Sequence, residues 1–177
     1  MANIVTFGEI MGRIEMEHHY RFTQALPGTV KITFAGAEAN VAASLAYMGR
    51  ETQFVTSLPE NPIGKSCLAY RKSLNVGLDH VLQTKQGRMG LYFLETGANQ
   101  RPSNVIYDRD YSSICVQDPQ AYDWENIFSN AQWYHISGIT PAISRQAATA
   151  ALASVKAAKE HGVQVSCDLN FRKKLWK

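Results

Sequence analysis

Three short stretches of the sequence carry polar and charged side chains in positions suited to binding a ligand. The first, Asp168-Leu169-Asn170-Phe171-Arg172, follows directly on residues 163–167, which are predicted to form a buried parallel strand. In open α/β sheets, ligands bind beyond the carboxyl ends of the strands, so this position favours a binding site. The alternative interpretation is a solvated loop that begins the next helix.

The second stretch is Tyr107-Asp108-Arg109, at the end of the strand candidate 105–109, with Tyr92 on the preceding strand candidate. Side chains alternate along a strand, so Tyr107 and Arg109 are predicted to point to one side and Asp108 to the other. An arginine beside a tyrosine on one face suits a ligand with a carboxylate and hydroxyl groups. On these residues alone, a surface salt bridge beside a packed aromatic ring is the stronger interpretation.

The third stretch, Gly36-Ala37-Glu38-Ala39-Asn40, opens an Ala-rich helix candidate. Small residues at a helix start let a ligand approach the backbone, and the free N–H groups favour negative charge or hydroxyl oxygens. Asn40 would add one donor group and one acceptor. Tight packing of the helix on a sheet explains the small residues equally well.

Two other motifs do not support a site. Gly64-Lys65-Ser66 lies where a phosphate-binding loop would end, but that loop needs a glycine five residues before Gly64, and Pro59 stands there. His18-His19 lacks the spacing of metal ligands, so no metal site is expected.

The elements that must position these side chains alternate between strands and helices. Strand candidates are 4–7, 53–58, 91–95, 105–109, 133–137 and 163–167, and helix candidates are 37–48, 63–74 and 143–158. Thr140 is predicted as the N-cap of the last helix, with Pro141 at its first position. Residues 133–167 therefore predict a right-handed βαβ unit with parallel strands. Together with exposed strands expected in 13–34, the pattern predicts an α/β fold carrying an extra patch of strands.

Composition excludes several functional classes. The 177 residues are 45% hydrophobic and 19% charged, as in globular proteins. No apolar stretch approaches the roughly 20 residues needed to span a bilayer, and the N-terminus lacks the features of a secretion signal. The three cysteines are far apart, which favours reduced thiols in the cytosol, and the net charge of +3 is dispersed. We therefore expect a cytoplasmic protein that binds neither membranes nor nucleic acids.

Seven segments, taken in order along the chain, resemble the ribokinase-like (PfkB) carbohydrate kinases, and among them the 2-keto-3-deoxygluconate kinases. The segments are Phe7-Gly8-Glu9-Ile10, Ala35-Gly36-Ala37-Glu38-Ala39-Asn40-Val41-Ala42, Leu58-Pro59-Glu60-Asn61-Pro62-Ile63-Gly64, Gly90-Leu91-Tyr92-Phe93-Leu94-Glu95, Tyr107-Asp108-Arg109, Ser137-Gly138-Ile139-Thr140-Pro141-Ala142, and Asp168-Leu169-Asn170-Phe171-Arg172 with Leu175-Trp176. Their shared order is more specific than any single motif. The chain departs from the family at Ala35, where the first glycine of a Gly-Gly pair is usual.

The resemblance implies a parallel-sheet sandwich with a small β-sheet lid over the sugar. The α/β core would comprise residues 1–12, 36–87 and 113–177, and the lid residues 13–35 and 88–112. The family's Gly-Ala-Gly-Asp signature, with the catalytic base and nucleotide site, belongs to a C-terminal half that these residues do not include. We therefore expect a chain truncated before that half, with no catalytic residue and no activity of its own.

The resemblance also implies which side chains contact the substrate. These are Gly36, Asn40 and Arg172 from the core, and Tyr92, Tyr107 and Arg109 from the lid. Further candidates are Arg13, Asp168 and Asn170. Arg13 stands where ribose kinases of the family carry an aspartate, and a cation there fits an acidic substrate, although an exposed arginine is an equally simple interpretation.

The implied activity is ATP-dependent phosphorylation of 2-keto-3-deoxygluconate or a similar sugar acid, with ATP and Mg²⁺ bound by the full-length enzyme. Arg109 and Arg172 suit the acid, because a charge-assisted hydrogen bond to a carboxylate contributes roughly 1.5–3 kcal/mol. The alternatives are a kinase for another sugar of the family, such as fructose, and a non-catalytic sugar-binding module. Lid strands in the family often pair between subunits, so a homodimer through the lid is also expected.

Overall fold

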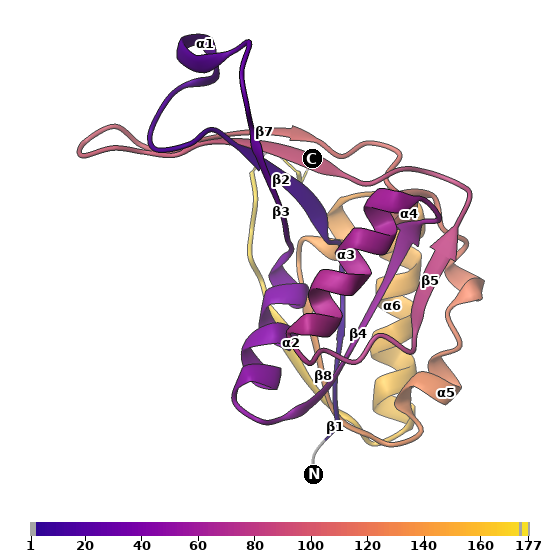
Figure 1. Ribbon diagram of the computed structural model, residues 1–177. Helices are drawn as coiled ribbons and strands as arrows, with labels where there is room; N and C mark the ends of the chain where they lie inside the picture. The colour runs from indigo at the N-terminus through magenta and orange to yellow at the C-terminus, as the bar shows by residue number, and fades with distance from the viewer. Residues whose placement is uncertain (1–2, 174, 177) are drawn as a thin grey trace.

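A computed structural model, which describes residues 3–173 and 175–176, contains two sheets, with helices packed around the larger one (Figure 1). The larger sheet is parallel, in the order β5-β4-β1-β8-β9. Its strands are β1 (Asn3–Phe7), β4 (Glu51–Pro59), β5 (Val81–Thr84), β8 (Ala131–Ser137) and β9 (Gln164–Asp168). Val5 and Phe7 of the central strand are fully buried, as expected for a parallel sheet covered on both faces.

Helices cover the two faces of this sheet with separate apolar clusters. They are α2 (Ala37–Tyr47), α3 (Pro62–Ser73), α4 (Ser113–Val116), α5 (Trp124–Phe128) and α6 (Arg145–Glu160). Ala39 of α2 and Cys67 of α3 pack with Phe54 in one cluster. Phe128 of α5 and Ala151 of α6 belong to the other. The predicted α/β class and the parallel βαβ unit β8-α6-β9 are both confirmed.

The predicted N-cap of α6 is wrong. The helix begins at Arg145, and the hydroxyl of Ser144 accepts a hydrogen bond from the backbone N–H of Ala147 at 3.0 Å. Thr140 instead opens the short 3₁₀ turn η2 (Thr140–Ala142). Its hydroxyl donates to the buried carboxylate of Glu38, so it does not cap the helix.

The smaller sheet is mixed, in the order β3-β2-β6-β7, and two distant segments of the chain supply its strands, as the sequence indicates. These strands are β2 (Met11–Glu15), β3 (Lys31–Ala35), β6 (Leu91–Glu95) and β7 (Asn104–Asp108), with α1 (Phe22–Ala25) between the first two. β2 pairs with β6 in parallel, and the outer pairs are antiparallel. The sheet extends away from the helices of the larger layer (Figure 1).

The chain passes between the two sheets at four places, called the crossings below: residues 8–10, Gly36, residues 88–90 and residues 109–112. The backbones approach closely here. A Cβ at Gly36 would lie 2.1 Å from the carbonyl oxygen of Glu9, and one at Gly90 would lie 2.6 Å from Glu9 Oε1. A side chain at either position would clash with Glu9, so both positions require glycine.

Candidate functional site

Four of the residues singled out in the sequence lie on one face of the small sheet. In the strand register Arg13 is opposite Tyr92, and Tyr92 is opposite Tyr107, so the three side chains form a row across β2, β6 and β7. The rings of Tyr92 and Tyr107 are 6.2 Å apart, and the guanidinium carbon of Arg109 lies 5.5 Å from the centre of the Tyr107 ring. We call Arg13, Tyr92, Tyr107 and Arg109 the aromatic–cationic face.

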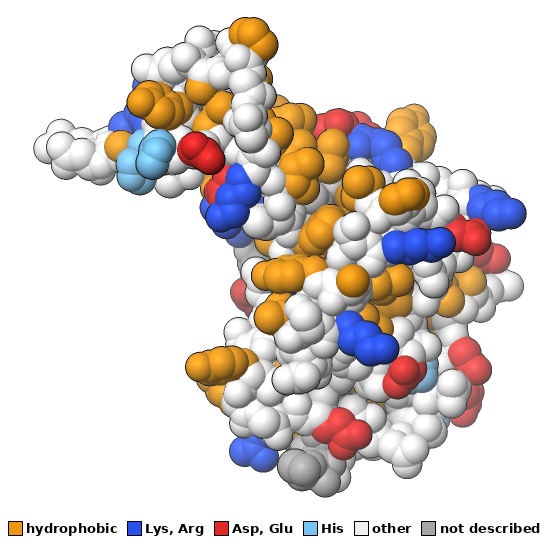
Figure 2. All heavy atoms as spheres, in the orientation of Figure 1, with side chains coloured by type: hydrophobic (Ala, Val, Ile, Leu, Met, Phe, Trp, Pro, Cys, Tyr) orange, Lys and Arg blue, Asp and Glu red, His pale blue; other side chains and the backbone are white. Residues whose placement is uncertain are grey.

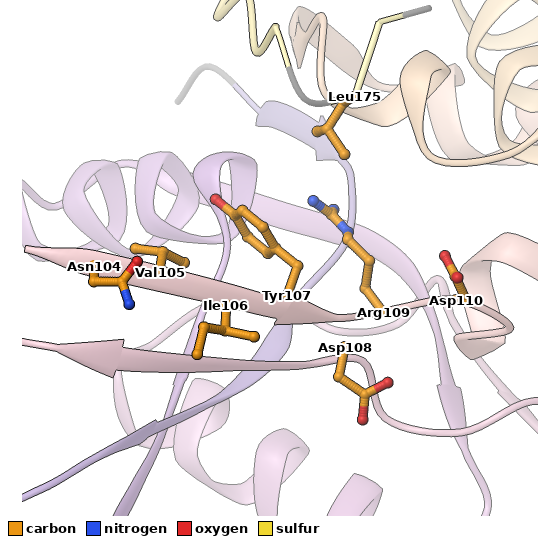
Figure 3. A pocket seen from close by; sticks show the side chains of 8 residues that line it. All are labelled: Asn104, Val105, Ile106, Tyr107, Asp108, Arg109, Asp110 and Leu175. Atoms are coloured by element: carbon orange, nitrogen blue, oxygen red, sulfur yellow. The ribbon is translucent and has the colours of Figure 1, made fainter. Parts of the chain in front are cut away.

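A pocket of about 460 Å³ opens along β7. It is lined by Asn104, Val105, Ile106, Tyr107, Asp108, Arg109, Asp110 and Leu175 (Figure 3). Tyr107 and Arg109 point to the same side of the strand, towards Leu175, and Asp108 points away, as alternation predicts. The volume lies within the roughly 300–1,000 Å³ usual for small-molecule sites.

Arg109 is buried and paired rather than exposed at the surface. Its Nε donates to Glu9 Oε2 at 2.9 Å, and its Nη2 forms an ion pair with the same oxygen. The hydroxyl of Ser112 donates to the other carboxylate oxygen at 2.6 Å. Among the described residues, Nη1 of Arg109 has no hydrogen-bond partner, so one end of the guanidinium remains able to donate. The surface salt bridge considered from the sequence is therefore a buried ion pair with Glu9.

A second buried carboxylate, Glu38, holds the start of α2 against the larger sheet. Its Oε1 accepts hydrogen bonds from the backbone N–H of Ser137 at 3.0 Å, from the Ser137 hydroxyl at 2.6 Å and from the Thr140 hydroxyl at 2.9 Å. Its other oxygen lies against Gly8, where a Cβ would approach it to 2.3 Å. Glu38 therefore joins the ends of β1 and β8 to the turn that carries Gly36.

Gly36 and Asn40, at the start of α2, differ in their surroundings. Gly36 is the N-cap of the helix and packs against the backbone of Glu9, which supports the packing interpretation of this small residue. Asn40 is exposed, and its Oδ1 accepts from Nη2 of Arg71 at 3.5 Å. Arg71 also donates to the carbonyl oxygens at Phe34 and Ala39, and burial lowers the pKa of its guanidinium.

The residues after β9 form a chain of local hydrogen bonds. Asp168 Oδ1 accepts from the backbone N–H of Asn170 at 2.9 Å, and Asn170 Oδ1 accepts from Arg172 Nε at 3.0 Å. The segment does follow the carboxyl end of a parallel strand. The expectation that this strand is buried is wrong, because β9 lies at the edge of the described sheet and its last two residues are exposed.

The structure groups the candidates into three places: the aromatic–cationic face, the start of α2, and the segment after β9. The 460 Å³ pocket includes Tyr107, Asp108 and Arg109 but none of the other candidate binding residues. Leu175, three residues beyond Arg172, brings the last segment to β7.

Sequence reasoning assigned no role to Glu9 or Glu38. Each could have been noticed as an acidic residue in an otherwise small or apolar surrounding, next to a strand end or at a helix start.

Burial raises the pKa of Tyr92, with the nearby guanidinium of Arg13 acting in the opposite direction. Its phenol is therefore protonated at neutral pH and can both donate and accept. In the described part of the chain, no three His, Cys, Asp or Glu side chains lie close enough together to hold a metal ion. The helices of that part include none that could cross a membrane.

Comparisons with known proteins find consistent similarities. The family profile described as pfkB family carbohydrate kinase matches residues 1–177. The 2-dehydro-3-deoxygalactonokinase of Haloferax volcanii is 33% identical over 175 residues, covering 99% of this chain and 54% of its own length. The crystal structure of 2-dehydro-3-deoxygluconokinase from Thermotoga maritima matches with a TM-score of 0.95 at 44% identity, over 99% of this chain and 53% of that one. A PfkB family carbohydrate kinase from Listeria grayi matches with a TM-score of 0.93 at 32% identity, over 99% and 54% of the two chains. The chain thus spans about half the length of these relatives.

Proposed function

The chain belongs to the pfkB family of carbohydrate kinases, and we propose that its full-length protein phosphorylates 2-keto-3-deoxygluconate or a closely similar sugar acid with ATP. Two of the similar proteins are named for 2-dehydro-3-deoxy sugar acids, which supports an acidic substrate. The observation that carries the proposal is the guanidinium of Arg109, which lines a pocket beside Tyr107 with Nη1 free of protein partners in the described residues.

We propose that the substrate is held from three directions. The carboxylate would be bound by Arg109 and Arg172, whose planar guanidinium groups suit it. The sugar hydroxyls would contact Tyr92, Tyr107, Gly36 and Asn40, with Arg13, Asp168 and Asn170 as further contacts. Binding would require the segment after β9 to approach the aromatic–cationic face, and Leu175 already contacts the pocket there.

In this proposal the small sheet is a lid, residues 13–35 and 88–112, over a core formed by residues 1–12, 36–87 and 113–177. In the full-length protein ATP would donate the phosphoryl group, and Mg²⁺ would neutralise the charge that develops on it during transfer. We assign no residue of this chain to the nucleotide, the metal or the catalytic base, and we propose that residues 1–177 alone do not transfer phosphate.

We also propose that two copies of the protein associate through the lid. The face of the small sheet opposite the aromatic–cationic face carries a row of apolar side chains, Ile32, Ile14, Phe93 and Ile106, one from each strand. Ile32 is 54% exposed and Ile106 is 53% exposed. Figure 2 shows hydrophobic side chains gathered on the small sheet and on the surface below it. A second copy would cover this row.

Steady-state kinetics of the full-length protein test the substrate. We expect ATP-dependent phosphorylation of 2-keto-3-deoxygluconate with a kcat/KM well above that for fructose. A higher kcat/KM for fructose would favour the alternative of a neutral-sugar kinase. Sugar binding by calorimetry with no phosphorylation of either sugar would favour a non-catalytic module.

A further inference from the structure

One residue, Glu9, contacts all of the other three crossings, the Gly36 crossing through its backbone and the other two through its carboxylate. The backbone of Glu9 packs against Gly36, and its Oε1 lies at Gly90 and accepts from Ser112. Its Oε2 accepts from Arg109. Glu9 itself lies in the first crossing, directly after β1, and is 4% exposed. The crossings between the two sheets therefore meet at a single buried acidic residue.

The ion pair with Glu9 involves only part of the Arg109 guanidinium, its Nε and Nη2 nitrogens. Nε and Nη2 point to Glu9, which fixes the plane of the group, because two parallel N–H donors to one carboxylate leave little rotational freedom. Nη1, at the other end, has no hydrogen-bond partner among the described residues, and Arg109 lines the pocket. Arg109 is 7% exposed, so without Glu9 a buried cation would lack its only carboxylate partner among the described residues.

We propose that Glu9 is a positioning residue that orients Arg109 for the carboxylate of an acidic substrate and that links this contact to the crossings between the two sheets. The proposal rests on the proposed function for the identity of the ligand. Substrate binding at Nη1 would change the position of Arg109, and Glu9 would transmit that change to Gly36, Gly90 and Ser112.

The first test uses the full-length enzyme with Glu9→Gln, which keeps the shape of the side chain and removes its charge. We expect KM for 2-keto-3-deoxygluconate to rise about tenfold, near the lower end of what a charge-assisted hydrogen bond contributes, with kcat reduced less than about twofold. Glu125→Gln is the surface control, because it makes the same change in an exposed carboxylate on α5 that lies 3.2 Å from Nε2 of His161, the residue after α6. It should leave KM unchanged.

A double-mutant cycle separates positioning from a general loss of structure. If Glu9 acts through Arg109, then Glu9→Gln should raise KM no further in an Arg109→Gln background. Additive effects on KM, or a Glu9→Gln variant with unchanged KM in an enzyme that phosphorylates the sugar acid, would overturn the proposal.

A second measurement needs no substrate. Backbone hydrogen exchange at residues 8–10, 36, 88–90 and 109–112 should be faster in Glu9→Gln than in the wild type and in Glu125→Gln. Exchange that is unchanged at these residues would overturn the link to the crossings. If the wild type does not phosphorylate 2-keto-3-deoxygluconate, the proposed function fails, and the exchange result still decides whether Glu9 holds the crossings.

Discussion

In the part of the chain that the structure describes, the buried charged side chains are those of Glu9, Glu38, Arg71 and Arg109, which are between 1% and 7% exposed. A buried charge is tolerated only when hydrogen bonds or an opposite charge replace water. Glu9 and Arg109 neutralise each other, Glu38 accepts three hydrogen bonds, and Arg71 donates to backbone carbonyl oxygens. All four lie at the crossings or around the start of α2, so polar networks hold the parts of the fold that border the proposed sugar site.

Arg172 is the site residue whose substitution should be most selective. It is exposed and bonded only to Asn170 among the described residues, so Arg172→Ala should leave the fold intact. In the full-length enzyme we expect KM for 2-keto-3-deoxygluconate to rise about tenfold to a hundredfold with a smaller change in kcat, because the lost contact of roughly 1.5–3 kcal/mol would act in ground and transition states alike. Steady-state kinetics with acidic and neutral sugars measure this. Equal losses on both kinds of sugar would show that Arg172 shapes the site rather than binding the acid.

Glu38→Ala should destabilise the protein by about 2–4 kcal/mol, because the N–H and hydroxyl of Ser137 and the hydroxyl of Thr140 would lose their acceptor in the interior. Urea unfolding of this variant is compared with Glu60→Ala, which removes an exposed carboxylate and should stay within about 0.5 kcal/mol of the wild type. Similar losses in the two variants would contradict the structural role of Glu38.

The thiol of Cys67 should make stability fall at alkaline pH. Burial raises the pKa of Cys67 from 9.0 to about 12, with Arg71 acting in the opposite direction. The fold therefore favours the protonated thiol, and this contribution is complete below pH 9 and is lost as the pH rises towards 12. From pH 8 to pH 10, the wild type should lose roughly 1 kcal/mol more unfolding free energy than Cys67→Ala, measured by urea titration at both pH values. Parallel losses would show that Cys67 does not contribute.

At the scale of secondary-structure elements, regular periodicity in the sequence was a sound guide. The strand predicted over 91–95 is β6 with the same bounds, and the helix predicted over 63–74 is α3, one residue earlier at each end. The short elements β5, α4 and α5 were not predicted, because four or five residues are too few to show a hydrophobic periodicity.

The site was predictable where it depends on local geometry and not where it depends on distant contacts. Alternation along one strand placed Tyr107 and Arg109 on the same side. The partner of Arg109 is Glu9, one hundred residues earlier, and nothing local in the sequence indicates that pairing. The same reason explains the misplaced cap of α6, since Thr140 is engaged by Glu38 from α2.

Ser144→Ala should therefore destabilise α6, whereas the sequence alone would have selected Thr140 for this test. The Ser144 hydroxyl satisfies the free N–H of Ala147, and loss of such a cap costs about 1 kcal/mol. The control is Thr149→Ala on the exposed side of the same helix, whose hydroxyl donates to the carbonyl oxygen of Arg145. Thermal unfolding should show a lower Tm for Ser144→Ala only, and equal Tm values would contradict the capping role.

At the scale of the whole molecule, the larger sheet has apolar surface on the side of α2. A pocket of about 250 Å³ there is lined by Ile4, Val41, Leu45, Trp133, His135 and Ser166. At the end of α2, Tyr47 is 92% exposed, and the next residue, Met48, is 72% exposed. The edge strand β9 adds unpaired backbone groups among the described residues.

A protein made of residues 1–177 alone should therefore bind a hydrophobic dye and associate. Exposed apolar surface of this kind promotes both. Gel filtration and dye fluorescence are the measurements, with Trp133→Lys expected to reduce the fluorescence. A monomer that binds no dye and melts cooperatively at high temperature would contradict this expectation.

The pairing of β2 with β6 has a consequence for synthesis of the protein. β2 and β3 leave the ribosome before β6, the parallel partner of β2, which follows only after residues 36–90 have been made. At about 5–20 residues per second, those 55 residues take roughly 3 to 11 seconds. During that interval β2 has an open edge, and Ile14 and Ile32 lack the neighbours Phe93 and Ile106. The nascent hairpin is thus a natural target for chaperones until the second half of its sheet arrives.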